Sequence, residues 1–304
     1  MIFPSDNQSV YYSTNKGICI NDSCESIIHN YLLKNYKNKI QMIFTSPPFP
    51  LKRAKKYGNK NGDEYKEWLC NIIKDLLPLL TDDGSLVIEM GNAWNSKEPT
   101  FSTLPLETLL DIKNKCNLNI CEEFIYFNPA RLPSPIEWVN KQRIRVKDSF
   151  TRIWWFSKSK FPYANNKNVL ENYSKQMQKL ISTGKYNSGK RPSEHNISQS
   201  AFSKDNGGAI PSNVIIAANT SSHNNYITYC KKNNLEIHPA RMAPEIPEFF
   251  IKFLTKENDI VLDCFAGSNT TGFMAESLNR SWISIEINKE YYEGSRARFG
   301  GDCI

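Results

Sequence analysis

The chain has 304 residues, enough for one large domain or for one domain with an inserted module. Its hydrophobic content of 40% can form a substantial core, but no apolar run approaches the ~20 residues that a membrane-spanning helix needs. The first residues also lack the basic and apolar regions of a signal peptide, so a cytosolic protein is expected.

The formal net charge is +7, and basic residues gather in three stretches, Lys52–Lys60, Lys141–Lys160 and Lys175–Lys204. Each stretch can meet the phosphates of a polyanion, although a solvated face is the simpler explanation for any one of them alone. The eight cysteines form no CxxC pair, and no histidine stands at zinc-ligand spacing from them. We therefore expect free thiols in a reducing compartment and no bound metal.

Strand and helix patterns alternate through the first half of the chain. Strands are predicted over residues 11–20, 40–44, 86–90, 120–127 and 153–156, and helices over residues 25–36, 63–77 and 106–116. Asp82-Asp83-Gly84 predicts a turn, whereas residues 51–62 and 128–140 are expected to be loops. This alternation predicts an α/β fold with a mostly parallel sheet covered by helices on both faces.

The composition changes near Phe161, and from there to about Asn234 the chain is rich in Asn, Ser and Lys. A small, loop-rich module is expected here, with disorder as the alternative. Regular patterns return at His238, with a helix predicted from Pro247 to Leu254.

The C-terminal part has the order strand, glycine-bearing turn, helix, strand and acid. The strands are predicted over residues 260–262 and 282–285, the turn begins at Asp263, and Glu286 follows the second strand. An acid roughly 20 residues after such a turn suits a carboxylate that bonds the ribose hydroxyls of an adenosine-containing cofactor. The sequence lacks GxGxxG, which disfavours a dinucleotide, and an ordinary βαβ unit is the alternative.

The loop Thr45-Ser46-Pro47-Pro48-Phe49 follows the predicted strand 40–44. Two prolines fix the backbone in an extended form and leave carbonyl acceptors beside an aromatic ring. Ligands bind beyond the carboxyl ends of strands in open α/β sheets, so this loop could hold a planar group with an amine, such as a nucleobase. A plain loop with a core phenylalanine is the alternative.

Ser-Pro-Pro-Phe and Asp-Cys-Phe-Ala-Gly-Ser-Asn-Thr-Thr-Gly together resemble the amino-methyltransferases that act on DNA, and the serine form resembles their N4-cytosine branch. Residues 132–140, 144–148, 154–158, 202–208 and 238–241 extend the likeness to the PvuII-type modification methyltransferases of the beta group, over nearly the whole chain. The resemblance implies a Rossmann-like S-adenosylmethionine-dependent methyltransferase fold in permuted order. It also implies methyl transfer from S-adenosylmethionine to the N4 amine of a flipped cytosine in duplex DNA, in a restriction-modification system.

The resemblance also implies roles for the catalytic residues Ser46, Pro47, Pro48, Phe49 and Glu89. Phe49 would stack on the flipped base, while the Ser46 hydroxyl and the Pro47 carbonyl would accept hydrogen bonds from its amine. The proton would leave through Ser46 towards Glu89, which stands where the family pattern has Asp. A strand-end carboxylate facing solvent is the alternative for Glu89.

The residues implied to bind the cofactor are Asp22, His238, Pro239, Ala240, Arg241, Asp263, Phe265, Gly267, Ser268, Asn269, Thr270 and Glu286. For Asp22, a cap of the following helix is an equally good alternative. The residues expected to bind DNA are Lys52, Arg53, Lys55, Lys56, Lys190, Arg191, His195 and Lys204. Residues 1–160 would form the catalytic half, residues 161–234 the target-recognition module and residues 235–304 the cofactor-binding half.

Three other functions are considered. An adenine N6 methyltransferase shares the fold, although Ser46 in place of an acid argues against it. A C5-cytosine methyltransferase needs a nucleophilic cysteine after a proline, which this chain lacks. A catalytically inactive DNA-binding regulator would not need both motifs intact. We expect a monomer that acts on double-stranded DNA without a membrane partner, with a cognate restriction endonuclease encoded nearby but not bound.

Overall fold

The computed structural model describes residues 10–49, 62–184, 189–190, 192–194, 196–197, 204–219 and 225–302. The chain divides into two compact units. The large unit consists of Met1–Tyr163 and Asn213–Ile304, and the small unit consists of Ala164–Ser212.

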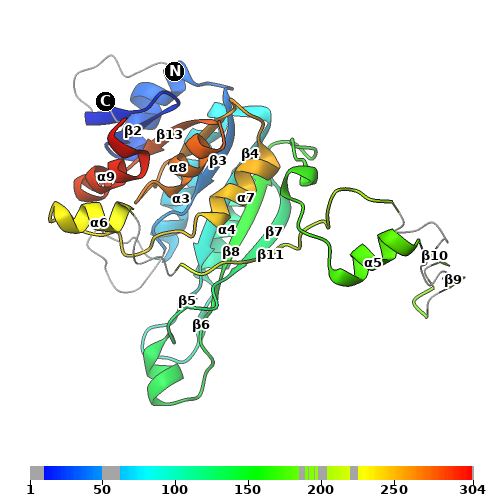
Figure 1. The fold of residues 1–304 in the computed structure, drawn as a ribbon. Helices are drawn as coiled ribbons and strands as arrows, with labels where there is room; N and C mark the ends of the chain where they lie inside the picture. The colour runs from blue at the N-terminus through cyan, green and yellow to red at the C-terminus, as the bar shows by residue number, and fades with distance from the viewer. Residues whose placement is uncertain are drawn as a thin grey trace. The chain divides into compact units, whose positions relative to one another are not determined.

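The large unit is built on a sheet of nine strands in the order β1-β2-β13-β12-β3-β4-β8-β7-β11 (Figure 1). In chain order these strands are β1 Val10–Ser13, β2 Gly17–Asn21, β3 Ile40–Thr45, β4 Leu80–Gly91, β7 Asn119–Phe127, β8 Phe150–Ser157, β11 Val214–Ile216, β12 Ile260–Asp263 and β13 Ser281–Ile285. Neighbours from β2 to β4 are parallel, and β11 is parallel to β7. The pairs β1–β2, β4–β8 and β8–β7 are antiparallel, so the predicted mixed, mostly parallel sheet is confirmed.

Helices cover both faces of this sheet. The helices of the large unit are α1 Cys24–Ile27, α2 Leu33–Asn35, α3 Gly62–Leu76, α4 Leu104–Lys115, α6 Asn225–Lys232, α7 Glu245–Leu254, α8 Thr270–Ser277 and α9 Lys289–Ser295. A π-helical turn, Ile28–Leu32, joins α1 to α2, and the 3-10 helices Leu77–Leu79 and Arg296–Asp302 follow α3 and α9.

Strand β3 explains the two layers, because every residue in it is buried and side chains alternate between faces. Ile43 packs in the core that α1, α3 and α4 cover. Met42 and Phe44 pack in the second core, beneath α7, α8 and α9. Figure 1 shows α7 and α8 lying across that second face.

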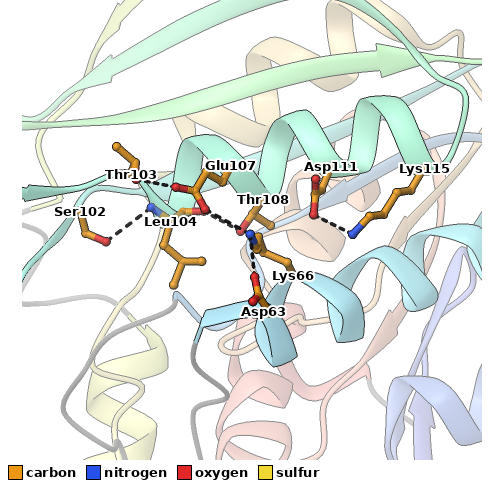
Figure 2. A network of polar contacts seen from close by, with 9 residues as sticks. All are labelled: Asp63, Lys66, Ser102, Thr103, Leu104, Glu107, Thr108, Asp111 and Lys115. Carbon is orange, nitrogen blue, oxygen red and sulfur yellow. Dashed lines mark hydrogen bonds and ion pairs between the residues drawn. The ribbon is translucent and has the colours of Figure 1, made fainter.

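Polar contacts on the first face hold α3 against α4 (Figure 2). The Lys66 ammonium lies 2.9 Å from an Asp63 oxygen in its own helix and 3.1 Å from a Glu107 oxygen in α4. Thr103 donates to the other Glu107 oxygen at 2.6 Å. Lys115 and Asp111 form an i,i+4 pair at 2.8 Å further along α4.

Two predicted elements differ in the structure. The single strand predicted over residues 11–20 is a hairpin of β1 and β2, turned where Thr14 accepts hydrogen bonds from the backbone N–H groups of Lys16 and Gly17. Strand β4 runs through the turn predicted at Asp82-Asp83-Gly84, with a shift of register against β3 at that place.

Several further elements of the large unit were not predicted. Strands β5 Ala93–Trp94 and β6 Phe101–Ser102 form a short antiparallel ribbon after β4. A π-helical turn, Glu137–Lys141, lies between β7 and β8, where residues 128–140 were expected to be a loop.

The small unit contains the 3-10 helix Asn166–Val169, α5 Lys175–Thr183, and the short paired strands β9 Gly189–Lys190 and β10 Asn196–Ile197. Its boundaries are narrower than those predicted for residues 161–234. Residues 213–234 belong to the large unit, because β11 pairs with β7 and α6 buries Tyr226 and Cys230 beside α9. In the described part of the chain, no helix combines the length and apolarity needed to cross a membrane.

Candidate active site

A cavity of about 480 Å³ lies at the edge of the sheet where β2, β13, β12, β3 and β4 reach their carboxyl ends. Its wall includes the predicted catalytic residues Ser46, Pro47, Pro48, Phe49 and Glu89 and the predicted cofactor residues Asp22, His238, Ala240, Asp263, Phe265, Gly267, Ser268, Thr270 and Glu286. Two motifs far apart in sequence thus share one cavity, because β3 and β12 are adjacent parallel strands.

A direct bond joins the two motifs where these strands end. Thr45, the last residue of β3, donates its hydroxyl proton to Oδ1 of Asp263 at 3.0 Å. The backbone N–H of Phe265 donates to the same oxygen at 3.1 Å, and Thr271 donates to Oδ2 at 2.7 Å. Burial raises the pKa of Asp263 to about 6, although these three donors favour its ionised form.

The carboxylate of Glu89 is buried next to the Pro-Pro loop rather than exposed to solvent. It accepts a hydrogen bond from Ser46 and another, at 3.0 Å, from the Thr151 hydroxyl on β8. Burial raises the pKa of Glu89, and both donors oppose that rise. The side chain is therefore a buried acceptor in contact with the serine of the loop.

Glu286 binds two backbone donors from different segments. Its Oε2 accepts from the N–H of Gly267 at 2.7 Å, and its Oε1 accepts from the N–H of Asn288 at 2.8 Å. Burial raises the pKa of Glu286 to about 7. The carboxylate thus fixes the glycine turn while it lines the cavity.

The glycine turn requires a residue without a side chain at position 267. Its φ is +53°, and a Cβ built there would lie 3.0 Å from Nε2 of His238. The His238 ring packs edge-on against Tyr291, with ring centroids 4.6 Å apart, and its backbone N–H donates to Tyr226 at 2.9 Å.

Asp22 also lines the cavity, at the end of β2. Its Oδ1 accepts from the N–H of Ser23, and its Oδ2 from the hydroxyl of Ser26. The N-cap of α1 is Ser23, whose hydroxyl accepts from the N–H of Ser26. Capping therefore does not require Asp22, contrary to the alternative considered from sequence.

Three predicted cofactor residues, Pro239, Arg241 and Asn269, lie outside the cavity wall. Asn269 instead caps α8 by accepting from the N–H of Gly272 at 3.1 Å, and it donates to the buried Tyr12 hydroxyl at 3.0 Å. Arg241 donates to the carbonyl of His238 at 3.2 Å and so holds the segment that contributes His238. The contacts of Asn269 and Arg241 in the structure are with other protein groups, and their contact with a cofactor stays a prediction.

Sequence reasoning missed two aromatic residues of α3 in the cavity wall, Tyr65 and Trp68. The Trp68 indole donates to Glu25 at 2.9 Å, and its ring lies 5.7 Å from the ring of Phe265. The Tyr65 hydroxyl is buried and finds no hydrogen-bond partner among the residues that the structure describes. The only signal in the sequence was that hydroxyl, a polar atom within an otherwise apolar helix stripe.

Most of the predicted DNA-binding residues, Lys52, Arg53, Lys55, Lys56, Arg191 and His195, lie outside the described residues. Lys190 and Lys204 are described, and both are exposed in the small unit. Within the described ranges, no cluster of three or more His, Cys, Asp or Glu side chains could hold a metal ion, and the seven cysteines found there are free thiols.

Comparisons with known proteins agree with this geometry. A family model described as DNA methylase matches residues 40–297. The type II methyltransferase M.PvuII of Proteus hauseri is 42% identical over 292 residues, which cover 95% of this chain and 85% of that protein. The type II methyltransferase M.HpaI of Haemophilus parainfluenzae is 29% identical, over 89% of this chain and 71% of that protein. The solved structure of the PvuII DNA methyltransferase (cytosine-N4-specific) is similar with a TM-score of 0.74 and 36% identity, over 94% of this chain and 87% of that one.

Proposed function

The chain belongs to the DNA methylase family, and from that premise we propose that it methylates the N4 amine of a cytosine in a specific duplex DNA site, with S-adenosylmethionine as methyl donor. One observation carries the proposal: the Ser46–Phe49 loop and the Asp263–Gly267 turn line a single cavity. A methyl donor held by the turn and a base held by the loop would then meet without crossing solvent.

The residues present fit an adenosine-containing cofactor. The glycine turn leaves room that a Cβ at Gly267 would fill, and Glu286 and Asp22 place carboxylate acceptors in the wall for hydroxyl or amine donors. Phe265 and Trp68 add aromatic surface, and the Tyr65 hydroxyl, which has no hydrogen-bond partner among the described residues, is a polar atom that a ligand could satisfy. S-adenosylmethionine, when bound, supplies an electrophilic methyl group on a sulfonium that leaves readily.

The remaining chemistry belongs to the loop. Phe49 would hold the plane of the base, and the Ser46 hydroxyl and the Pro47 carbonyl would accept hydrogen bonds from its amine. These acceptors orient the lone pair of the nitrogen, and orientation of this kind can contribute ~7–11 kcal/mol to catalysis. No covalent bond between protein and base is needed.

Ser46 and Glu89 provide a route for the proton that the amine must lose. Ser46 donates to the Glu89 carboxylate, so it can take a proton from the amine while its own proton passes to Glu89. The raised pKa of Glu89 favours acceptance, because burial penalises the ionised carboxylate more than the neutral acid.

The target amine is hidden in a base pair, so the cytosine must leave the helix, at a cost of a few kcal/mol of stacking and pairing. We assign recognition of the DNA sequence to the small unit with its exposed Lys190 and Lys204, and phosphate contacts to the basic segment around Lys52. The chain would act as a monomer in the cytoplasm and protect DNA against a cognate restriction endonuclease that it does not bind.

The test is methylation of a duplex library with tritiated S-adenosylmethionine, followed by digestion to nucleosides and mass spectrometry. We expect N4-methylcytosine, and we expect it to disappear in Ser46→Ala and Phe49→Ala variants that still bind the cofactor. N6-methyladenine would overturn the choice of base. Binding of DNA without any methylated nucleoside would overturn the enzymatic function.

A further inference from the structure

The chain between β7 and β8, residues 128–149, forms an arm that runs out beyond the sheet beside β5 and β6 (Figure 1). Its base is held firmly: the N–H of Asn128 donates to the carbonyl of Ser149 at 2.8 Å, and Asn92 donates to Asp148 at 2.8 Å. Arg131 donates to the carbonyl of Phe150 at 3.0 Å. The arm is thus a defined structure and not a loose connection.

Beyond its base the arm has no core. No residue from Leu132 to Lys147 is buried. Val146 is 86% exposed, Leu132 80% and Ile136 61%. Large apolar side chains exposed along one short segment are a candidate surface for a partner.

The charges around these apolar side chains indicate which class of partner would bind them. Residues 131–148 contain five cations and only two acids. One acid, Glu137, pairs with Lys141 at 2.9 Å, and the other, Asp148, accepts from Asn92 in the base of the arm. The exposed part is therefore cationic, which favours a polyanion and disfavours a second copy of this chain.

The arm begins next to the catalytic loop. Strand β8 is antiparallel to β4, with Thr151 opposite Gly91, and the Phe49 ring lies against Gly91. Thr151 also donates to Glu89, only a few residues from the point where the arm ends at Ser149. A duplex whose cytosine reached Phe49 would therefore pass close to the arm.

We propose that this arm is a DNA-binding wedge, in which Leu132 and Val146 pack against the base pairs beside the flipped cytosine and the surrounding cations contact phosphates. The proposal rests on the proposed function, because a flipped base leaves a gap in the stack. Apolar side chains that insert between base steps unstack them and kink the duplex, and an enzyme that flips a base must meet the same cost of unstacking.

The first test is the double variant Leu132→Ser/Val146→Ser, with Phe161→Ser as the matched control. Phe161 is 88% exposed but follows the other end of β8, near the amino end of β4. All three side chains are exposed, so folding is expected to be unchanged and is checked by thermal unfolding. We expect the dissociation constant for a duplex, measured by fluorescence anisotropy, to rise at least about tenfold in the double variant only. Cofactor affinity, measured by calorimetry, should not change.

The second test addresses the cations. In Arg143→Gln, the slope of log K for DNA against log salt concentration should fall by about one unit, as expected for one lost phosphate contact. Wild-type affinity for DNA in the double variant would overturn the proposal. So would a dimer of the wild type that this variant dissociates, because the arm would then cover a second copy. Since binding is read separately from methyl transfer, a chain that binds DNA through the arm but forms no methylated base would refute the proposed function alone.

Discussion

The Phe49 ring lies against residue 91 because that residue is glycine. A Cβ built at Gly91 would lie 2.5 Å from Cε2 and 2.6 Å from Cδ2 of Phe49, far inside van der Waals contact. Gly91 is the last residue of β4, two positions after Glu89. The strand that carries the proposed proton acceptor therefore also sets the position of the ring that would hold the base.

Gly91→Ala is expected to displace the Phe49 ring and to lower kcat/KM for methyl transfer by about 100-fold, as displacements near 1 Å can do. A double-mutant cycle with Phe49→Ala is the control. If the alanine acts through the ring, Gly91→Ala should lower kcat/KM little further in a protein that already carries Phe49→Ala. Additive losses would show that Gly91 acts by another route.

Thr151→Val is expected to move the acidic limb of the pH profile of kcat to higher pH. The hydroxyl of Thr151 donates to Glu89 and favours its ionised form, so its removal raises the pKa of the carboxylate that must accept the proton. Activity at neutral pH should fall by about tenfold, in line with the loss of one hydrogen bond to a charged group. KM for DNA and for the cofactor should change little.

Thr151→Ser keeps the donor and should keep the pH profile. If the serine and valine variants lose activity equally, with no displacement of the acidic limb, Thr151 serves packing between β4 and β8 and does not position Glu89.

The raised pKa of Glu286 predicts that the stability of the protein falls with rising pH while its affinity for the cofactor increases. Its pKa is about 7 in the folded protein and 4.5 in an unperturbed chain, so the folded state holds a proton that the unfolded state loses between these values. The stabilisation by this proton is complete below about pH 4.5 and is lost as pH rises through about 7, a change on the order of 3 kcal/mol. Cofactor affinity should rise over the same range, because only the ionised carboxylate can accept hydrogen bonds with both oxygens.

The measurement compares wild type with Glu286→Gln between about pH 5 and pH 8, by urea unfolding and by calorimetric titration of the cofactor. Asp263, with a pKa of about 6, contributes a pH dependence to both proteins, so its contribution cancels when the variant is subtracted from the wild type. In the variant, the free energy of unfolding and the cofactor affinity should both lose the dependence on pH that is attributed to residue 286. Retention of the slope of cofactor affinity in Glu286→Gln would refute a direct role of this carboxylate.

Tyr65→Phe is expected to weaken cofactor binding about five- to tenfold, the equivalent of one hydrogen bond, while the protein without cofactor becomes equally stable or more stable. The reason is that the buried Tyr65 hydroxyl finds no partner among the described residues, and burying such a group costs about 1–3 kcal/mol. Tyr12→Phe is the control, since that hydroxyl bonds Ser295 at 2.6 Å and Asn269 at 3.0 Å. It should lower the free energy of unfolding, and unchanged cofactor affinity in Tyr65→Phe would contradict the prediction.

The fold and the meeting of the two motifs could be predicted from sequence because both depend on local signals. The fully buried strand β3 and the turn after Asp263 each carry their own pattern, and parallel strands bring their carboxyl ends to one edge. The hairpin of β1 and β2 was missed although Asn15 and Gly17 are usual turn residues, because its two strands are short and were predicted as one continuous strand.

The remainder of the site depends on packing between distant segments, which no local pattern contains. Tyr65 and Trp68 fit the apolar stripe of α3 and pack in or against the first core, and nothing in that pattern indicates that they also line the cavity. The burial of Glu89 depends likewise on Thr151 of β8, a neighbour only in the folded sheet. Asn269 was predicted from the family motif, but its role as the N-cap of α8, with a left-handed backbone of φ +53°, could not be read from that motif.

The two strands that flank the small unit, β8 and β11, are paired with the same strand, β7. Both ends of the segment between β8 and β11 are therefore held by hydrogen bonds to the same sheet, whatever the sequence between them. A change of length or sequence within Ala164–Ser212 need not disturb the register of the strands that hold Glu89 and Thr151. The architecture thus permits the segment to be exchanged by recombination or engineering on an unaltered sheet, which would let the DNA recognition proposed for the small unit change independently of catalysis.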